Sequence, residues 1–223
     1  MWHKMSEVTL RQYVQGCDTD FVPTTGLRER KKEKTREALV SSALRQFTER
    51  GFDRVTVEEI AAASDVSPRT FFRYFASKEE ALFAESDAHR TRLLALLAGE
   101  DPGVPPFQAL ESAMRMVAAD YAEQRDVLQL RQRIVMSTPS LRTRAAERQQ
   151  GWETEVIEHL RASGRARHMT DLDLRLVVAA TTTALRVAVE AWIGSDGSGD
   201  LTPLIDDAFK RLRAGFDKVK EPR

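Results

Sequence analysis

Cysteine and long apolar runs are scarce in this chain, and each scarcity excludes a class of protein. Cys17 is the single cysteine among 223 residues, so a disulfide framework within the chain is excluded and a reducing compartment, the cytoplasm, is expected. The longest charge-free apolar stretch near the C-terminus extends from Leu176 to Leu185. Because about 20 apolar residues are needed to span a bilayer, we expect no membrane-spanning helix and no membrane partner.

The residue groupings of catalytic and metal sites are also missing. The four histidines have no cysteine or histidine partner at the spacing of a metal site. The glycine-rich stretch at 194–199 is not followed by the Gly-Lys-Ser/Thr of a phosphate-binding loop. Cys17 lies in a segment without a sustained period, where a nucleophile would lack a fixed base. We therefore expect a protein that is not an enzyme and that holds no metal and no cofactor.

A net charge is lacking as well, since 34 Lys and Arg side chains balance 34 Asp and Glu side chains. Over the whole chain this balance argues against a nucleic-acid-binding protein, which usually carries a basic excess. The charge is nevertheless uneven. Residues 27–50 hold eight basic and four acidic side chains, a net charge of +4, whereas residues 51–86 carry −3. The neutral total hides a basic segment, for which a solvated tail is the alternative interpretation.

Helical periodicity dominates what the sequence does contain. Apolar residues recur at helical spacing from Val40 to Phe47, and Gly51 predicts the end of that helix. No long segment alternates with period two, so we expect an all-α fold: a flexible extension at 1–27, a helix-turn-helix domain at 28–84, and a helical bundle at 85–223 for ligand binding and dimerisation. Further helices are predicted at about 78–98, 106–123, 125–136, 140–163, 171–194 and 201–219.

Two helix starts follow the basic segment in close succession. Thr56 with Glu59 matches a capping box, and Ser67 followed by Pro68 marks the start of a short helix. Residues 64–67 form a four-residue turn between the two helices. Short helices joined by such a turn are typical of a helix-turn-helix.

The second helix of this pair, residues 68–75, carries two different faces. Phe71 and Phe75 are four positions apart and share the face that we expect to be buried. The other side carries arginines and hydroxyls, and an arginine can form two hydrogen bonds to guanine in the major groove. An amphipathic helix with ordinary surface arginines is the alternative. The predicted DNA contacts are Thr56, Ser67, Arg69, Thr70, Arg73, Tyr74 and Lys78, with Arg28, Lys31 and Lys32 on the phosphates.

The C-terminal half contains a helix that is apolar nearly all the way round, at 176–193, and such a helix is buried on more than one side. The helix predicted at 201–219 carries an apolar stripe. Two such helices from each of two subunits would form a four-helix interface, so the pattern predicts a homodimer, with a monomeric core as the alternative. The predicted interface residues are Leu185, Val189, Trp192, Leu204, Phe209 and Leu212.

Side chains of the same bundle are candidates for lining an effector pocket, although simple core packing is the alternative for each of them. A flexible thioether such as that of Met114 adapts to irregular ligands. The predicted lining residues are Phe83, Leu93, Met114, Val117, Tyr121, Leu128, Trp152 and Thr182.

The run VSPRTFFRYF at residues 66–75, followed by Ser77-Lys78-Glu79, resembles the DNA-binding domain of the TetR family, and the likeness extends over about 33–84. This resemblance implies a homodimeric transcriptional repressor, a palindromic double-stranded DNA operator and release by a small-molecule effector. Phe72 stands where many members of the family have tyrosine, which would remove one hydroxyl from the phosphate contacts.

The C-terminal part is similar to one branch of the same family, in which this domain is described as binding acyl-CoA-like ligands. The similarity covers about 90–215 and is carried by SLRTR at 140–144, Gly151-Trp152-Glu153 and ALRVAVEAW at 184–192. It implies an acyl-CoA-like or other apolar effector. A helix-rich protein-interaction adaptor without DNA binding is the alternative function, and such an adaptor would not need the cationic side chains of residues 69–78.

Overall fold

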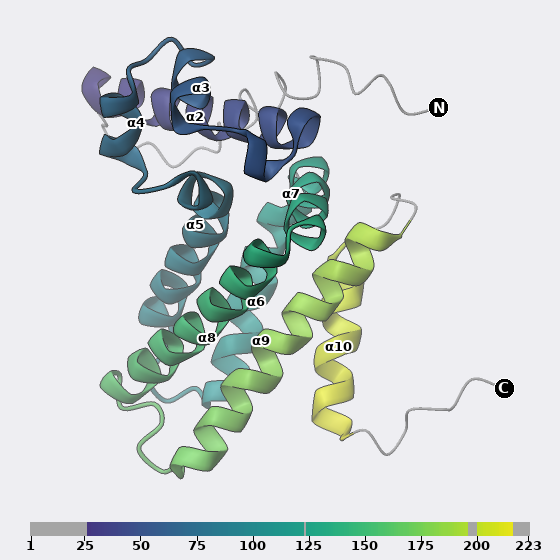
Figure 1. Cartoon of the computed structure of the whole chain (residues 1–223). Helices are drawn as coiled ribbons and strands as arrows, with labels where there is room; N and C mark the ends of the chain where they lie inside the picture. The colour runs from purple at the N-terminus through teal and green to yellow at the C-terminus, as the bar shows by residue number, and fades with distance from the viewer. Residues whose placement is uncertain (1–25, 123, 196–199, 216–223) are drawn as a thin grey trace, which may run out of the picture. The chain divides into compact units, whose positions relative to one another are not determined.

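The computed structural model describes residues 26–122, 124–195 and 200–215 (Figure 1). The extension predicted at 1–27 lies almost entirely outside these residues, as does the end of the helix predicted at 201–219. The chain divides into two compact units: residues up to Glu85 together with Leu130–Leu141, and residues Ser86–Gln129 together with those from Arg142 onward. The sequence-based boundary between 84 and 85 had assigned residues 130–141 to the second domain.

Every regular element within the described residues is helical, so the predicted all-α fold is confirmed. The helix predicted at 68–75 ends one residue earlier, and the one predicted at 201–219 ends at Ala214. The elements are α2 (Leu27–Arg50), the 3-10 turn η1 (Phe52–Arg54), α3 (Val57–Ala62), α4 (Pro68–Tyr74), α5 (Lys78–Gly99), α6 (Pro106–Ala122), α7 (Arg125–Ser137), α8 (Pro139–Ala162), α9 (Asp171–Gly194) and α10 (Thr202–Ala214).

The core of the first unit is built on the apolar face of α2. Leu39, Leu44 and Phe47 are each at most 2% exposed, and the Phe47 ring lies 4.9 Å from that of Phe52 in η1. The helix α2 ends at Gly51, as the sequence predicted. Gly51 has φ +84°, a conformation that glycine adopts without steric cost. The helix α2 thereby provides the platform on which the next two helices pack.

The turn between α3 and α4 has the hydrogen bonds of a Schellman motif. The Val66 N–H donates to Ala61 O at 3.0 Å and the Asp65 N–H donates to Ala62 O at 3.1 Å. Asp65 has φ +54°, and aspartate is among the few residues other than glycine that tolerate this left-handed conformation. The turn occupies residues 63–67, one residue more than the predicted 64–67, with aspartate at the position that glycine usually occupies.

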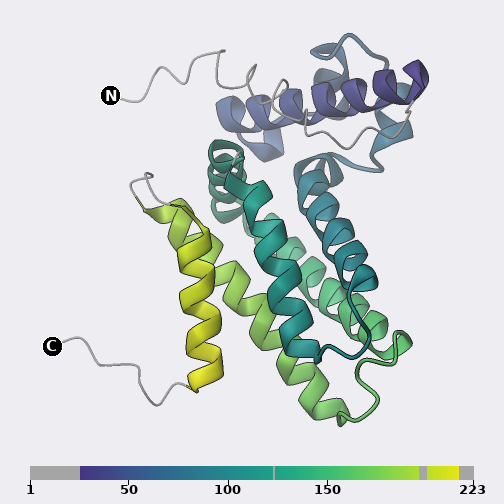
Figure 2. The same cartoon turned by 180° about the vertical axis from the view of Figure 1, so that it is seen from behind.

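In the second unit, α9 is the central helix, and it packs against α10 and α6 (Figure 2). Its buried side chains, among them Leu174, Val178 and Trp192, join one apolar cluster with side chains of α5, α6, α8 and α10. By length and composition α9 is apolar enough to cross a membrane. Core helices of helical bundles share that property, and one side of α9 is buried in this cluster.

Two arginines satisfy main-chain carbonyl groups near helix ends in this unit. The buried Arg165 guanidinium donates to Leu97 O at 3.0 Å, to Glu100 O at 2.8 Å and to Asp101 O at 3.2 Å, at the end of α5. Arg125 donates to Trp192 O and Ser195 O at the end of α9. Carbonyl groups at a helix C-terminus lack intrahelical donors, so cationic side chains placed there stabilise the helix.

We expect Arg165→Ala to lower the free energy of unfolding by about 2–4 kcal/mol, because it leaves buried carbonyl groups unpaired and removes packed side-chain volume. Urea unfolding followed by far-UV circular dichroism measures the change. Arg167→Ala is the matched control, since Arg167 is exposed and two positions away. Equal stability of the two variants would contradict the role assigned to Arg165.

Candidate nucleic-acid interface

The short helix α4 presents one aromatic face inward and one mixed face outward. Phe71 is 0% and Phe75 4% exposed, and their rings lie 5.6 Å apart, as the spacing predicted. On the other side Arg69 and Arg73 are exposed, and Phe72 is 53% exposed. The outward face therefore offers two guanidinium groups and an aromatic ring to a partner.

Hydroxyl groups at the start of α4 position this face. The Ser67 hydroxyl accepts a hydrogen bond from the Thr70 N–H at 3.2 Å and lies 3.0 Å from the Thr70 hydroxyl. Pro68 occupies the first turn, where its missing N–H costs nothing. Tyr74 is half-buried, and the Arg73 guanidinium lies 5.3 Å from its ring, which restrains that arginine. Ser67 thus caps α4 through the backbone of Thr70, and the contact of either residue with DNA stays a prediction.

The capping box at the start of α3 is complete. The Glu59 N–H donates to the Thr56 hydroxyl at 3.3 Å, and the Thr56 N–H donates to the Glu59 carboxylate at 2.9 Å. Arg50 of α2 forms an ion pair with the same carboxylate at 2.7 Å. The backbone hydrogen bond from Thr56, with the Arg50 side chain, holds the pKa of Glu59 below its ordinary value. Thr56 therefore caps the start of α3, and its predicted DNA contact stays a prediction.

Lys78, at the first position of α5, makes contacts that the sequence did not predict. Its Nζ donates to Phe52 O and Val55 O, both at 2.8 Å, and lies 4.4 Å from the centre of the Phe52 ring. Two of the three ammonium hydrogens are thus used within the first unit, fastening α5 to the segment between α2 and α3. A phosphate contact through the third hydrogen stays a prediction.

The basic residues predicted to meet phosphates from α2 are solvent-accessible. Arg28, Lys31 and Lys32 are all exposed in the first two turns of the helix. Lys32 lies 3.6 Å from the Glu29 carboxylate, an exposed pair one helical turn apart. Such a pair contributes little to stability, so the side chain can exchange that partner for another anion at small cost.

The residues predicted to line an effector pocket fall into both units. Phe83 is buried in the first unit, whereas the other seven belong to the second. Five of these, Leu93, Met114, Val117, Leu128 and Trp152, are members of one buried cluster, with Tyr121 packed against it. Thr182 is 1% exposed and donates to the Glu153 carboxylate at 2.8 Å. The structure thus brings seven of the eight into one interior, and their contact with a ligand stays a prediction.

Three of the predicted dimer contacts are buried within the chain's own bundle, and their contact with a second copy stays a prediction. Leu185, Trp192 and Phe209 are 6%, 2% and 0% exposed because they form the core of the chain's own bundle. Val189 and Leu212 are half-buried against that core. The sixth predicted interface residue, Leu204, is 37% exposed. The sequence showed that α9 is apolar on several sides, but it did not show which side faces inward.

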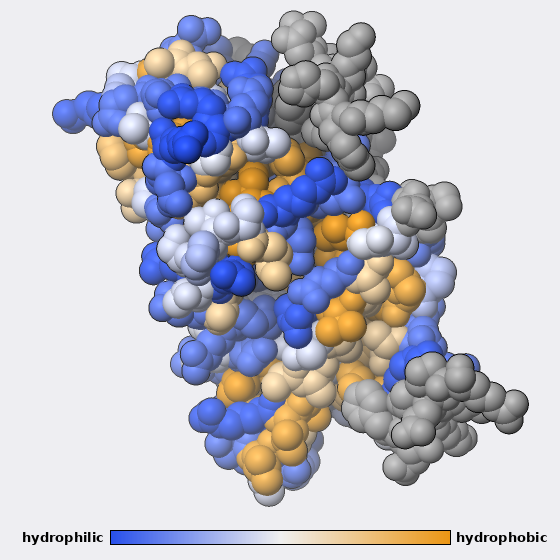
Figure 3. All heavy atoms as spheres, turned by 45° about the vertical axis from the view of Figure 1, so that its right-hand side comes forward, coloured by the Kyte–Doolittle hydropathy of each residue, from blue (hydrophilic) through white to orange (hydrophobic). Residues whose placement is uncertain are grey.

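Other apolar residues of α9 are exposed instead. Leu172, Leu176 and Val187 are 66%, 58% and 49% exposed, and with Thr183 they recur at spacings of four and seven along one side of the helix. Figure 3 shows apolar side chains at the lower end of the molecule, where α9 begins, and a second group further up along α9 and α10. We call Leu172, Leu176, Thr183 and Val187 of α9, together with Leu204 of α10, the exposed α9–α10 face.

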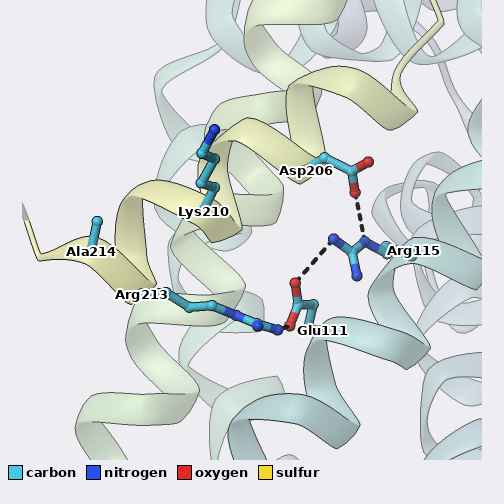
Figure 4. A pocket seen from close by; sticks show the side chains of 6 residues that line it. All are labelled: Glu111, Arg115, Asp206, Lys210, Arg213 and Ala214. Carbon is cyan, nitrogen blue, oxygen red and sulfur yellow. Dashed lines mark hydrogen bonds and ion pairs between the residues drawn. The ribbon is translucent and has the colours of Figure 1, made fainter.

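A charged groove of about 340 Å³ lies between α6 and α10 (Figure 4). The buried carboxylate of Glu111 forms ion pairs with Arg213 and, at 3.1 Å, with Arg115, which also pairs with Asp206 at 2.6 Å. The Glu111–Arg213 and Arg115–Asp206 pairs fasten α10 to α6. The groove is lined by Glu111, Arg115, Asp206, Lys210, Arg213 and Ala214, so it contains none of the residues predicted for the apolar effector pocket.

A capped helix-turn-helix whose second helix presents arginines to solvent defines a DNA-binding protein of the helix-turn-helix class. Comparison with known proteins agrees. The family profile "Bacterial regulatory proteins, tetR family" matches residues 39–86, and the profile "MftR C-terminal domain" matches residues 104–217. The chain therefore belongs to the TetR family of transcriptional regulators, with a C-terminal domain of the MftR type. TetR-family regulators are not enzymes.

Two curated relatives show how the likeness is distributed. The chain is 28% identical to the putative mycofactocin biosynthesis transcriptional regulator MftR of Mycobacterium tuberculosis over 194 residues, which cover 86% of this chain and 96% of that protein. It is 46% identical to the transcriptional regulator TcmR of Streptomyces glaucescens over 92 residues, which cover 41% of each. The second match thus spans less than half of TcmR.

Solved structures share the fold. FadR of Thermus thermophilus, a TetR-family transcriptional repressor solved in complex with lauroyl-CoA, is 25% identical with a TM-score of 0.53, covering 84% of this chain and 98% of that one. FadR of Bacillus halodurans, a fatty acid degradation regulator, is 21% identical with a TM-score of 0.58, covering 82% and 96%. The latter likeness concerns the fold alone.

We expect the stability difference between the wild-type protein and Glu59→Gln to depend on pH. Because the folded-state pKa of Glu59 lies below its unfolded value of about 4.3, the carboxylate stabilises the fold above that value. The contribution is lost as the pH falls through the folded pKa. Thermal melting should therefore show a lower melting temperature for Glu59→Gln at pH 7, and the difference should shrink as the pH falls below about 4.3 and through the folded pKa.

Glu58→Gln is the matched control, because it removes the same charge from the same helical turn and leaves the capping box intact. A Glu59→Gln variant that melts like Glu58→Gln at pH 7 would contradict the contribution assigned to the capping box and its Arg50 partner.

Proposed function

We propose that this regulator is a homodimeric repressor that binds a palindromic operator and leaves it when an apolar, acyl-CoA-like effector binds. The observation that carries the DNA-binding part is the outward face of α4, on which Arg69 and Arg73 are exposed at the position of a recognition helix. The site of action is the cytoplasm, where the operator lies.

Base reading is assigned to α4 and phosphate contact to α2. The Arg73 guanidinium, restrained by the Tyr74 ring, is suited to two hydrogen bonds with one guanine. The exposed cations Arg28, Lys31 and Lys32 suit phosphates, which carry no sequence information. Because the chain as a whole is neutral, salt-dependent attraction to any DNA is modest, and specificity depends on few side chains.

The homodimer is assigned to the exposed α9–α10 face. Exposed apolar side chains such as Leu172, Leu176 and Val187 are unfavourable in water unless a partner covers them, and a second copy presents the same face. A two-fold pair of recognition helices would match two half-sites of a palindrome. This face replaces the buried residues that the sequence had suggested.

The effector class is supported by one relative and by the interior of the second unit. The Thermus thermophilus FadR structure holds lauroyl-CoA. In this chain, the buried indole N–H of Trp152 has no hydrogen-bond partner within the described residues, although it lies in the otherwise apolar cluster. A donor of this kind suits a ligand that is apolar and carries one acceptor, such as a carbonyl oxygen.

Arg73→Ala tests the reading of bases. We expect it to weaken binding to an operator selected from random DNA by about 1–3 kcal/mol per half-site, roughly a tenfold loss or more, with a much smaller effect on random DNA. Fluorescence anisotropy at fixed salt measures both affinities. Arg142→Ala removes an exposed charge from the second unit and is the control. Equal losses on both DNAs would make Arg73 a phosphate contact.

Val187→Glu combined with Leu176→Glu tests the dimer face. We expect the wild-type protein to sediment at about twice the 25.2 kDa chain mass at micromolar concentration and the variant as a monomer, because four carboxylates would be desolvated in the interface. Met116→Glu, at a methionine that is 49% exposed on α6, is the control. A variant that stays dimeric would show that another surface forms the interface.

A further inference from the structure

The outward face of α4 carries a large apolar side chain as well as its two arginines. Phe72 is 53% exposed, whereas Phe47, Phe71 and Phe75 of the same unit are at most 4% exposed. A single exposed apolar side chain is ordinary on a protein surface, so exposure by itself indicates no function. The position of Phe72 on the reading helix is what distinguishes it.

Phe72 contributes little to the packing that holds α4 in place. Its ring lies 5.6 Å from the ring of Phe71, with the two planes at 85°, so the two rings meet edge to face. Phe71 and Phe75 are the side chains of α4 that fill the core beneath it. More than half of the Phe72 side chain is left to solvent, and it therefore has apolar surface that a partner can cover.

The neighbours of Phe72 on the exposed face are cationic. Arg69 lies three positions earlier, about one helical turn away on the same side, and Arg73 follows directly; both are exposed. Side chains three positions apart on a helix have Cβ atoms roughly 5–6 Å apart. Stacked base pairs are about 3.4 Å apart along the DNA axis, so a base contacted by Phe72 lies about one or two base-pair steps from one contacted by Arg69.

The chemistry of the ring restricts what it can recognise. A phenyl group has no hydrogen-bond donor or acceptor, so it forms no hydrogen bond to a phosphate or to the polar edge of a base. In the major groove the C5-methyl group of thymine is the apolar feature by which base pairs differ, and phenylalanine is among the side chains suited to it. Cytosine, adenine and guanine present hydrogen-bonding groups there instead.

We propose that Phe72 determines specificity for a thymine in each half-site of the operator, by packing its ring against the C5-methyl group. That thymine lies about one or two base-pair steps from the guanine that an arginine of α4 contacts. This inference rests on the proposed operator binding and specifies a second base that α4 recognises. The arginines thus read hydrogen-bonding groups and Phe72 reads an apolar one.

Removal of single methyl groups from the DNA tests the proposal. An operator selected from random DNA by the full-length wild-type protein is synthesised with each thymine in turn, and its symmetry mate, replaced by deoxyuridine, which pairs as thymine does and lacks the C5-methyl group. Fluorescence anisotropy at fixed salt measures each affinity. We expect one thymine per half-site at which the replacement weakens wild-type binding about fourfold per half-site, the loss expected when one methyl-sized apolar group is no longer buried.

Three variants assign that loss to Phe72. Phe72→Ala should bind the thymine-containing operator more weakly and show no further loss with deoxyuridine at that position, because the ring that contacts the methyl group is already gone. Phe72→Tyr keeps the ring and should keep the sensitivity to the methyl group. Met136→Ala removes a side chain that is 56% exposed on α7 and is the matched control, with affinities like those of the wild-type protein. Thermal melting verifies that each variant is folded.

The outcomes separate this inference from the proposed function. A wild-type protein that is insensitive to the loss of every thymine methyl group overturns the inference. So does a Phe72→Ala variant that shows the wild-type loss at each thymine, since another side chain then contacts the methyl group. In both cases a preference of the wild-type protein for the operator over random DNA leaves the proposed function standing. Equal binding to both DNAs overturns the proposed function and the inference together.

Discussion

The burial of two phenylalanines under α4 is the constraint on which the reading surface depends. A helix of seven residues, Pro68–Tyr74, is too short to be stable in water by itself. Phe71 and Phe75 supply the missing stability by packing beneath it, and the Ser67 cap sets where it begins. Because these two side chains point inward, helical geometry requires Arg69, Phe72 and Arg73 to point outward. The DNA-reading face is thus a consequence of core packing on the opposite side.

Buried and half-buried charged groups in this protein mainly hold helices together. Lys78 and Arg165 donate to main-chain carbonyl groups, and Glu111 receives two arginines between α6 and α10. These groups are largely satisfied by their partners, so they act as braces. Arg131 pairs with Glu85 through Nη2, while its Nε and Nη1 have no hydrogen-bond partner within the described residues.

Local signals predicted the first unit well and the second less completely. The capping box of Thr56 and Glu59 and the turn before Ser67 involve residues within a few positions of one another, so their pattern is readable in the chain. The bounds of α9, Asp171–Gly194, also agree with the predicted range of 171–194. The orientation of α9 is different. With apolar residues on several sides, helical periodicity leaves open which of them face inward, and the structure buries Trp192 and leaves Leu176 exposed.

The sequence by itself determined an all-helical chain, the position of its helix-turn-helix and the arginines of α4, because these features follow from caps, turns and spacings along a few residues. The tertiary structure decided what depends on distant partners: that Lys78 is bonded to the carbonyl groups of Phe52 and Val55, that α9 leaves Leu172 and Val187 exposed, and that Arg131 meets Glu85. Such contacts join residues from separate helices. Only the packing of those helices, which no local pattern specifies, brings them within bonding distance.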